Sequence, residues 1–257
     1  MRQTDASTSD RAGAFFAPEM VKAAVFDIGG VFLYPNYSEV QALLADLGAT
    51  LADQSLGDDL TFYRRAHHAG VAALAAASDL QRTDGLPEHT EHFWLVYDHA
   101  YARALGVEDH LIDQLRVAIR TEWAWPHLEN IKAFHRLVEA GLPVAIVSNN
   151  DGSAVQQMAD HGVCQVGDGP LPTVPIIVDS GVLGVSKPDP RIMAPALAAL
   201  GVAPEHVVYV GDTVHADVVG ATNAGMQVVQ LDPFDHHADY GHPRVRDVAE
   251  LASLLGF

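Results

Sequence analysis

Acidic, hydroxyl and basic side chains recur in this sequence directly after short apolar runs, in the four segments 26–31, 146–149, 186–190 and 210–217. Asp27 is a carboxylate that can attack an electrophile. Ser148 and Lys187 supply a hydroxyl and an ammonium group that can hold an anion. Asp212 and Asp217 are two carboxylates that can hold a hard cation. This set of residue types points to nucleophilic attack by a carboxylate on an anionic substrate.

Each of these residues also has an ordinary structural explanation when it is taken alone. Asp27 can cap the turn that follows it, Ser148 can begin a helix, and Lys187 can be a solvated loop lysine. Asp212 can belong to a turn, and Asp217 can favour the N-terminus of a helix. The combination is harder to explain by coincidence, because the chain has only three lysines and each candidate follows an apolar run.

The elements that would position these residues alternate along the chain. Apolar runs typical of buried parallel strands lie at 21–28, 143–148, 174–178, 207–210 and 227–231. Helical patterns lie between them, at 127–140, 151–161, 189–200 and 214–224. This alternation predicts βαβ units and an open, Rossmann-like parallel sheet. Such sheets bind ligands beyond the carboxyl ends of their strands, where the candidate residues lie.

Residues 37–125 interrupt this alternation. Apolar side chains recur there at helical spacing, for example in Val40-Leu43-Leu44-Leu47 and Phe93-Val96-Tyr97-Ala100. We therefore expect a flexible tail (1–20), an α/β core (21–36 and 126–257) and an inserted α-helical cap (37–125). An insertion of this kind either covers the ligand site or serves packing alone.

Composition excludes several classes of protein. Lys and Arg number 15 against 33 Asp and Glu, and the resulting net charge of −18 disfavours nucleic acid or an anionic membrane as partner. The single cysteine, Cys164, excludes an internal disulfide framework. The polar N-terminus does not resemble a secretory signal, and no apolar run approaches the ~20 residues of a membrane span. We expect a soluble, cytoplasmic protein that acts on a small molecule.

The four segments together resemble the haloacid-dehalogenase-like (HAD) hydrolase superfamily. The resemblance runs from residue 21 to the C-terminus and is strongest over 178–226, in Ser180 to Pro190 and in Gly211-Asp212 through Asp217 to Met226. The superfamily implies a Rossmann-like core, and one large subgroup has a helical cap inserted after the first motif. Residues 37–125 occupy that place.

The resemblance also implies a role for each candidate residue. Asp27 would be the nucleophile and a magnesium ligand, and Ser148, Asn149 and Lys187 would cradle the transferred group. The metal site would comprise Asp27, the main-chain carbonyl of Gly29, Asp212 and Asp217. The implied reaction is the magnesium-dependent hydrolysis of a small phosphomonoester through an aspartyl-phosphate. A magnesium ion and a lysine suit it, because phosphate oxygens repel an attacking carboxylate.

The sequence departs from the family pattern at Gly29. Phosphatases of the family usually carry a second aspartate there, which protonates the leaving oxygen and then activates water. Its loss removes a general acid, which is typically worth about 10²–10⁴ in rate. Two alternatives follow: a dehalogenase acting on 2-halo acids, or a weakly active or non-catalytic protein that binds phosphorylated metabolites. Because dehalogenases usually replace part of the acidic motif, and this chain keeps Asp212 and Asp217, the phosphatase is favoured.

Other polar residues carry weaker signals. His89 and His92 are three residues apart, but without a nearby third ligand they are typical of an exposed helix face. Arg64 and Arg65 could bind a substrate anion or could be solvated. For His215, next to the acidic motif, a surface position is the favoured interpretation.

Overall fold

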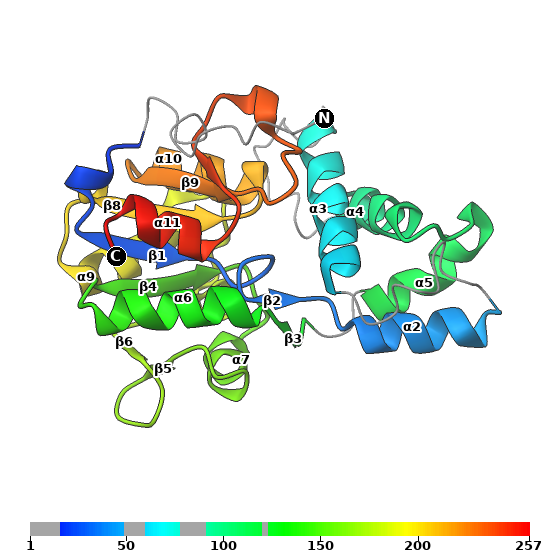
Figure 1. Cartoon of the computed structure of the whole chain (residues 1–257), viewed down its shortest axis with the longest axis horizontal. Coiled ribbons are helices and arrows are strands. Elements are labelled where there is room, and N and C mark those ends of the chain that lie inside the picture. Colours follow the sequence, from blue (N-terminus) through cyan, green and yellow to red (C-terminus); the bar gives the residue numbers. More distant parts are fainter. Residues whose placement is uncertain (1–15, 49–59, 78–90, 120–122) are drawn as a thin grey trace, which may run out of the picture. The chain divides into compact units, whose positions relative to one another are not determined.

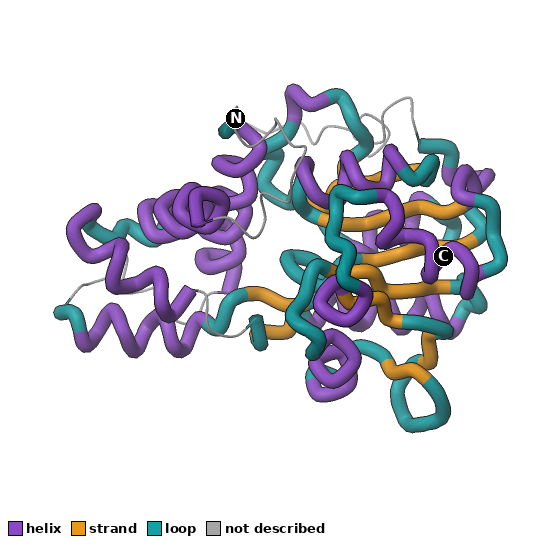
Figure 2. The backbone as a smooth tube through the Cα atoms, turned by 180° about the vertical axis from the view of Figure 1, so that it is seen from behind, coloured by secondary structure: helices purple, strands orange, loops and turns teal. Residues whose placement is uncertain are grey.

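The computed structural model of the chain describes residues 16–48, 60–77, 91–119 and 123–257 (Figures 1 and 2). They belong to two compact units: the sheet unit, formed by residues up to 31 and from 129 onward, and the helical unit, residues 32–128. Residues 1–15 of the expected tail lie outside the described part. The described residues of the expected tail, 16–20, include a buried Phe16 and a 3-10 helix, Pro18–Met20.

A six-stranded parallel sheet forms the centre of the sheet unit. Its strand order is β10-β9-β8-β1-β4-β7, and each neighbouring pair is parallel. In chain order the strands are β1 Ala23–Phe26, β4 Val144–Ser148, β7 Ile177–Asp179, β8 Val207–Gly211, β9 Gln227–Leu231 and β10 Arg244–Val245. Strand β1 lies between β4 and β8, so the segments that follow these three strands meet at one edge. The predicted Rossmann-like α/β class is confirmed.

Helices cover both faces of this sheet because successive side chains of a strand point to opposite sides. On one face, Phe26 of β1 meets Phe134 of α6 (Leu128–Glu139) edge to face. On the other face, Val25 and Tyr209 share an apolar cluster with Met193 and α9 (Ala194–Leu200). The remaining helices of the unit are α7 Ala154–Asp160, α8 Ser180–Leu183, α10 Val219–Asn223 and α11 Val248–Leu254.

Three expected elements differ in detail. The run 174–178 is divided at Pro175, which has no N–H to donate. Strand β6 (Thr173–Val174) pairs with β5 (Gln165–Val166) in a separate two-stranded sheet, and β7 begins only at Ile177. The helical pattern 189–200 starts as a 3-10 helix, Pro190–Met193, and 214–224 starts as a π-helix, Val214–Val218.

The described residues of the helical unit form four α-helices, one short 3-10 helix (Asp109–Leu111) and one short antiparallel strand pair. The elements are β2 Leu33–Tyr34, α2 Tyr37–Asp46, α3 Leu60–Ala76, α4 Glu91–Ala104, α5 Ile112–Ile119 and β3 Trp125–Pro126. Val40 and Tyr97 are buried in its core, as the apolar spacing predicts. Gly70 lets α3 approach α4 closely, because a Cβ at this position would lie 2.6 Å from the ring of Tyr97.

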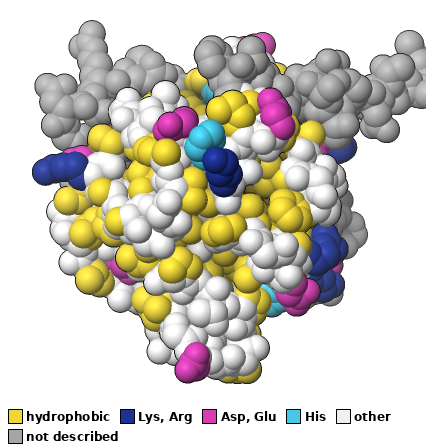
Figure 3. All heavy atoms as spheres, turned by 90° about the vertical axis from the view of Figure 1, so that its left-hand side faces the viewer, with side chains coloured by type: hydrophobic (Ala, Val, Ile, Leu, Met, Phe, Trp, Pro, Cys, Tyr) yellow, Lys and Arg dark blue, Asp and Glu magenta, His cyan; other side chains and the backbone are white. Residues whose placement is uncertain are grey.

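The described surface is mixed rather than uniformly acidic. Figure 3 shows a face on which hydrophobic and uncharged side chains predominate and charged side chains are few. Among the described helices, none combines the length and the apolar character that a membrane crossing requires.

A buried carboxylate fixes the turn that follows β9. Asp232 accepts hydrogen bonds from the main-chain N–H groups of His236 (3.0 Å) and His237 (2.9 Å) and from Arg244 Nη1 (2.9 Å). Burial alone would raise the pKa of Asp232. The bonds from His237 and Arg244 outweigh this effect and hold the pKa of Asp232 well below its ordinary value.

We expect Asp232→Asn to lower the free energy of unfolding at pH 7 by about 2 kcal/mol, because the variant loses hydrogen bonds to a charged group. The pKa of Asp232 is lower in the folded chain than in the unfolded one. Its stabilising contribution is therefore present above about pH 4 and is lost as the pH falls further. Urea unfolding at pH 7 and pH 3 measures the difference, which should shrink at pH 3. Asp235→Asn is the control, because Asp235 also binds Arg244 but is exposed.

Candidate active site

Asp27 is the first residue after β1, and it lies at the centre of the sheet edge. Its main-chain N–H donates to the carbonyl of Val210 on β8 (2.9 Å), which continues the strand pairing by one residue. The side chain is buried. Its Oδ1 lies 2.8 Å from the Nζ atom of Lys187, so the predicted nucleophile and the predicted lysine form an ion pair.

The lysine is held by both its side chain and its backbone. Its ammonium group donates to Asp217 Oδ1 (2.7 Å) and to the hydroxyl of Tyr209 (3.1 Å). Its main-chain N–H donates to Asn149 Oδ1 (2.8 Å), and Asn149 Nδ2 donates back to the carbonyl of Lys187 (3.1 Å). The side-chain amide of Asn149 therefore bonds both main-chain polar groups of Lys187, as the backbone of a neighbouring strand would. It fixes Lys187 beside the end of β4.

Asp217 has hydrogen bonds on both carboxylate oxygens. Oδ1 accepts from Lys187 and from the hydroxyl of Tyr209 (3.0 Å), and Oδ2 accepts from the N–H (2.9 Å) and the Oγ1 (2.6 Å) of Thr213. Gly211 is required beside it, because a Cβ there would overlap the Asp217 side chain. These four bonds use the acceptor positions of a carboxylate. Direct binding of a metal ion by Asp217 would have to displace one of them.

Asp212 follows β8 immediately and is buried. Its main-chain carbonyl accepts a hydrogen bond from Gln230 Nε2 on β9 (2.7 Å), which holds the turn after β8 in place. Carboxylate oxygens of Asp27, Asp212 and Asp217 lie within 4.8 Å of one another. Asp27 Oδ1 is buried and accepts no well-aligned hydrogen bond, although the charge of Lys187 lies beside it. These oxygens fit a hard divalent cation.

The charges of the site act on one another strongly. Burial, opposed by Lys187 and reinforced by Asp217 and Asp212, raises the pKa of Asp27 to about 7. Burial would also raise the pKa of Asp217, but Lys187 and the bonds from Thr213 hold it below its ordinary value. Burial disfavours the ammonium of Lys187, yet Asp217 and Asp27 raise its pKa well above the usual range. The lysine is therefore charged, while Asp27 requires further positive charge to be fully ionised at neutral pH.

A loop that follows β4 carries the remaining predicted residues. Ser148 is the last residue of β4 and is buried, and its hydroxyl makes no hydrogen bond among the described residues. Asp179 fixes this loop by accepting from the N–H groups of Gly152 and Ala154. Ser148 thus presents a hydroxyl whose hydrogen-bonding capacity is unused, whereas the side chain of Asn149 is occupied by Lys187.

Comparison with known proteins agrees with this geometry. The model of a hydrolase family, the haloacid dehalogenase-like hydrolases, matches residues 21–225. The chain belongs to the haloacid dehalogenase-like hydrolase family. It is therefore an enzyme of the hydrolase class.

Relatives of this hydrolase carry two kinds of name. The phosphoserine phosphatase of Thermus thermophilus is 30% identical over 188 residues, which cover 70% of this chain and 72% of that protein. The (S)-2-haloacid dehalogenase H-109 of Pseudomonas putida is 26% identical over 242 residues, 91% of this chain and 98% of that protein. A crystal structure of a HAD phosphatase from Thermococcus onnurineus, 19% identical, covers 92% of this chain and 98% of its own with a TM-score of 0.52, a likeness of fold.

Sequence reasoning overlooked three residues of this hydrolase that bind the predicted ones: Tyr209, Thr213 and Gln230. Tyr209 and Gln230 lie inside apolar strands, and Thr213 follows Asp212 in a turn. The only signal in the sequence is a polar group within or next to an apolar run, and that signal does not say which partner the group binds.

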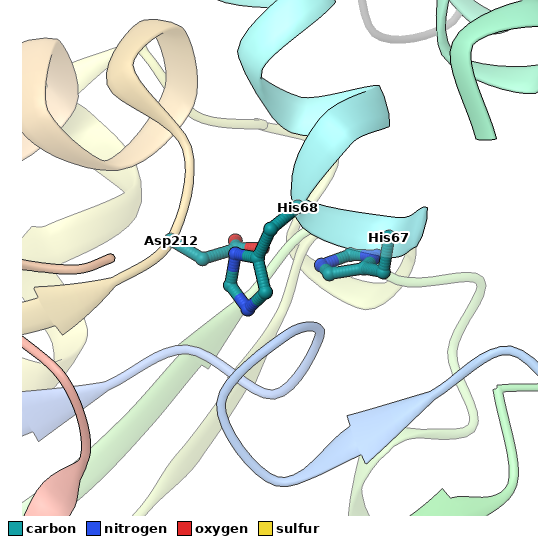
Figure 4. Close-up of side chains that lie close together, drawn as sticks. All are labelled: His67, His68 and Asp212. Carbon is teal, nitrogen blue, oxygen red and sulfur yellow. The ribbon is translucent and has the colours of Figure 1, made fainter. Parts of the chain in front are cut away.

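The other residues that the sequence singled out are Arg64, Arg65, His89, His92 and His215. His215 is half-buried, and its Nε2 has no hydrogen-bond partner among the described residues. Arg64 lies over the ring of Tyr34 in the helical unit. His89 and the side chain of His92 lie outside the described residues. Figure 4 shows Asp212 beyond the end of β8, and His67 and His68 at consecutive positions of α3, where His67 Nδ1 lies 2.7 Å from the hydroxyl of Tyr97.

We expect Thr213→Val to lower the free energy of unfolding of this hydrolase by about 1.5–3 kcal/mol, because the variant keeps the shape of threonine but loses a hydrogen bond to a charged group. Thr213→Ser keeps the hydroxyl and should lose less than half as much. Thermal and urea unfolding of the two variants measure the difference. Equal stability of the valine and serine variants would contradict the role of the hydroxyl.

Proposed function

We propose that this protein is a magnesium-dependent phosphatase that hydrolyses a small phosphomonoester through an aspartyl-phosphate on Asp27. The observation that carries the proposal is the buried group of Asp27, Lys187, Asp212 and Asp217 at the ends of adjacent parallel strands. It combines a nucleophile, an ammonium group and two further acids. A metal-free displacement does not need those two acids.

In the first step an oxygen of Asp27 attacks phosphorus, and the bond from phosphorus to the ester oxygen breaks. The ester oxygen leaves with the electron pair and takes a proton from water, because Gly29 offers no acid. In the second step a water oxygen attacks the phosphorus of the aspartyl-phosphate, which releases inorganic phosphate and restores the carboxylate. Lys187 favours the charged form of Asp27 and orients it, and Ser148 donates its hydroxyl to a phosphate oxygen. Asn149, whose side chain is engaged, contributes its main-chain N–H.

The proposed metal ligands are Asp27, Asp212 and the main-chain carbonyl of Gly29, with Asp217 close enough to bind through water. A bound magnesium ion would neutralise phosphate oxygens and the excess charge of the three carboxylates. The residues support this assignment because Asp27 Oδ1 is buried without a well-aligned donor. The pKa of Asp27, raised to about 7 without a metal, would fall when a cation binds.

The helical unit is proposed to act as a cap that selects the substrate. Its insertion directly after the segment that carries Asp27 supports this role, as does its separate core. The phosphoserine phosphatase of Thermus thermophilus, by its name, acts on a small phosphomonoester, and we propose a substrate of the same chemical class here.

One observation favours a second candidate. Gly29 offers no proton donor, and the leaving group of a 2-halo acid, a halide, needs none. In that reaction Asp27 would attack carbon, halide would leave, and water would hydrolyse the resulting ester. The relative named (S)-2-haloacid dehalogenase gives this candidate its support. The two further acids, Asp212 and Asp217, favour the phosphatase, because a metal-free displacement does not need them.

A panel of phosphate esters and 2-halo acids, assayed for phosphate and chloride release with magnesium and with EDTA, separates the two candidates. We expect phosphate release that EDTA abolishes. Asp27→Asn should reduce turnover at least about 10³-fold, because it removes the attacking carboxylate. Asp160→Asn, an exposed aspartate on α7, is the matched control and should keep the rate of the original protein. Chloride release that persists in EDTA would refute the phosphatase proposal and support the dehalogenase.

Restoring the missing acid tests the role assigned to Gly29. We expect Gly29→Asp to raise turnover of alkyl phosphates by up to about 10²-fold, because a general acid protonates their poor leaving group. Aryl phosphates should gain much less, since their leaving oxygen needs little protonation. Gly29→Asn is the control, because it has nearly the same size and cannot donate an acidic proton. An equal gain for alkyl and aryl esters, or an equal effect of the asparagine, would refute the scheme.

A further inference from the structure

Tyr209 lies in the middle of β8 and is fully buried, yet its hydroxyl reaches the charged group at the end of the sheet. The hydroxyl oxygen accepts from Lys187 Nζ at 3.1 Å. It lies 3.0 Å from Asp217 Oδ1 and 3.1 Å from the carbonyl of Val147, the two acceptors for its single hydrogen. The ring belongs to the apolar cluster beneath the sheet edge. Tyr209 therefore joins the apolar core to the polar site.

The ammonium group of Lys187 has three hydrogens and three partners. Two of them, Asp217 Oδ1 and the Tyr209 hydroxyl, form aligned hydrogen bonds, and the third partner is Asp27 Oδ1 at 2.8 Å. An ammonium group is symmetric about its last carbon–nitrogen bond, so two fixed hydrogen bonds determine the direction of the third hydrogen. These two bonds therefore fix the orientation of the ammonium group beside Asp27, whose Oδ1 lies at ion-pair distance without a well-aligned hydrogen bond.

We propose that Tyr209 is a positioning residue whose hydroxyl holds the ammonium of Lys187 beside the nucleophile Asp27. This inference rests on the proposed function, in which Asp27 attacks. An ammonium group beside a carboxylate favours its ionised form and helps it keep one geometry during attack. Because Asp217 and Tyr209 hold the ammonium beside Asp27, Lys187 contributes more to the reactivity of Asp27 than to substrate affinity.

Tyr209→Phe tests this role because it removes the hydroxyl and keeps the packed ring. With no partner in place of the hydroxyl, the ammonium can rotate away from Asp27. We expect kcat to fall about tenfold, the loss of one hydrogen bond to a charged group, while KM changes less than about twofold. Tyr101→Phe is the matched control, because Tyr101 is equally buried and its hydroxyl has no hydrogen-bond partner among the described residues. It should leave both constants unchanged.

A second readout does not depend on turnover. The chain has only three lysines, Lys22, Lys132 and Lys187, so protein labelled with ¹⁵N-lysine gives an ammonium spectrum with at most three signals. Lys187, buried and bound, should exchange its hydrogens with water slowly. In Tyr209→Phe this exchange should be at least about tenfold faster, because one hydrogen loses its acceptor. In Tyr101→Phe it should not change.

The outcomes separate this inference from the proposed function. If Asp27→Asn keeps full turnover, or no ester or halo acid is hydrolysed, the proposed function fails. The lysine spectrum still shows whether Tyr209 holds the ammonium. If Asp27→Asn is inactive and Tyr209→Phe matches the original protein in kcat, the positioning role is refuted. It is also refuted if KM rises tenfold at unchanged kcat, or if hydrogen exchange of Lys187 is the same in both proteins.

Discussion

The buried ammonium of Lys187 is the interaction on which the rest of the site depends. Moving a charged amine out of water costs several kcal/mol unless ion pairs and hydrogen bonds replace its hydration. Asp27, Asp217 and Tyr209 provide that replacement. Their positions, in turn, require Asn149 to hold the lysine backbone, Thr213 to hold Asp217, and Gly211 to leave room for its carboxylate. Removing any one of these weakens the set of contacts that compensates the buried charges, which explains why so much of the local sequence serves one side chain.

Three carboxylates surround this single ammonium, so the site retains two excess negative charges when all of them are ionised. The raised pKa of Asp27 is the response of the protein alone to that excess and to burial. A divalent cation would remove the imbalance without any change in the fold. The same electrostatic constraint therefore favours a metal ion, whose charge would also reduce the repulsion of an anionic substrate.

The parallel sheet makes this concentration of charge feasible. Strand β1 lies between β4 and β8, so three loops from distant parts of the chain meet where these strands end. The charged residues stand above an apolar cluster that includes Val25, Val147 and Tyr209, which is rigid enough to hold them close together. Gln230 of the neighbouring strand β9 also supports the site. Its side-chain amide donates to the main-chain carbonyl of Asp212 and contacts His237 and His242, which follow β9 in the chain. The described residues of the inserted helical unit form their own core and contribute no strand to this sheet.

The amino-acid sequence alone determined the class of fold, because apolar runs and helical periods are local properties that a parallel sheet with helical connections must satisfy. It also singled out Asp27, Ser148, Lys187, Asp212 and Asp217 as candidates, because their residue types and positions near strand ends are unlikely to coincide by chance. Tertiary structure decided what the sequence could not express. It placed Tyr209 against Lys187, occupied the Asn149 side chain with the lysine backbone, and gave Asp217 four hydrogen bonds. It also divided the run 174–178 at Pro175. These outcomes depend on distances between residues far apart in the chain, and only packing sets those distances.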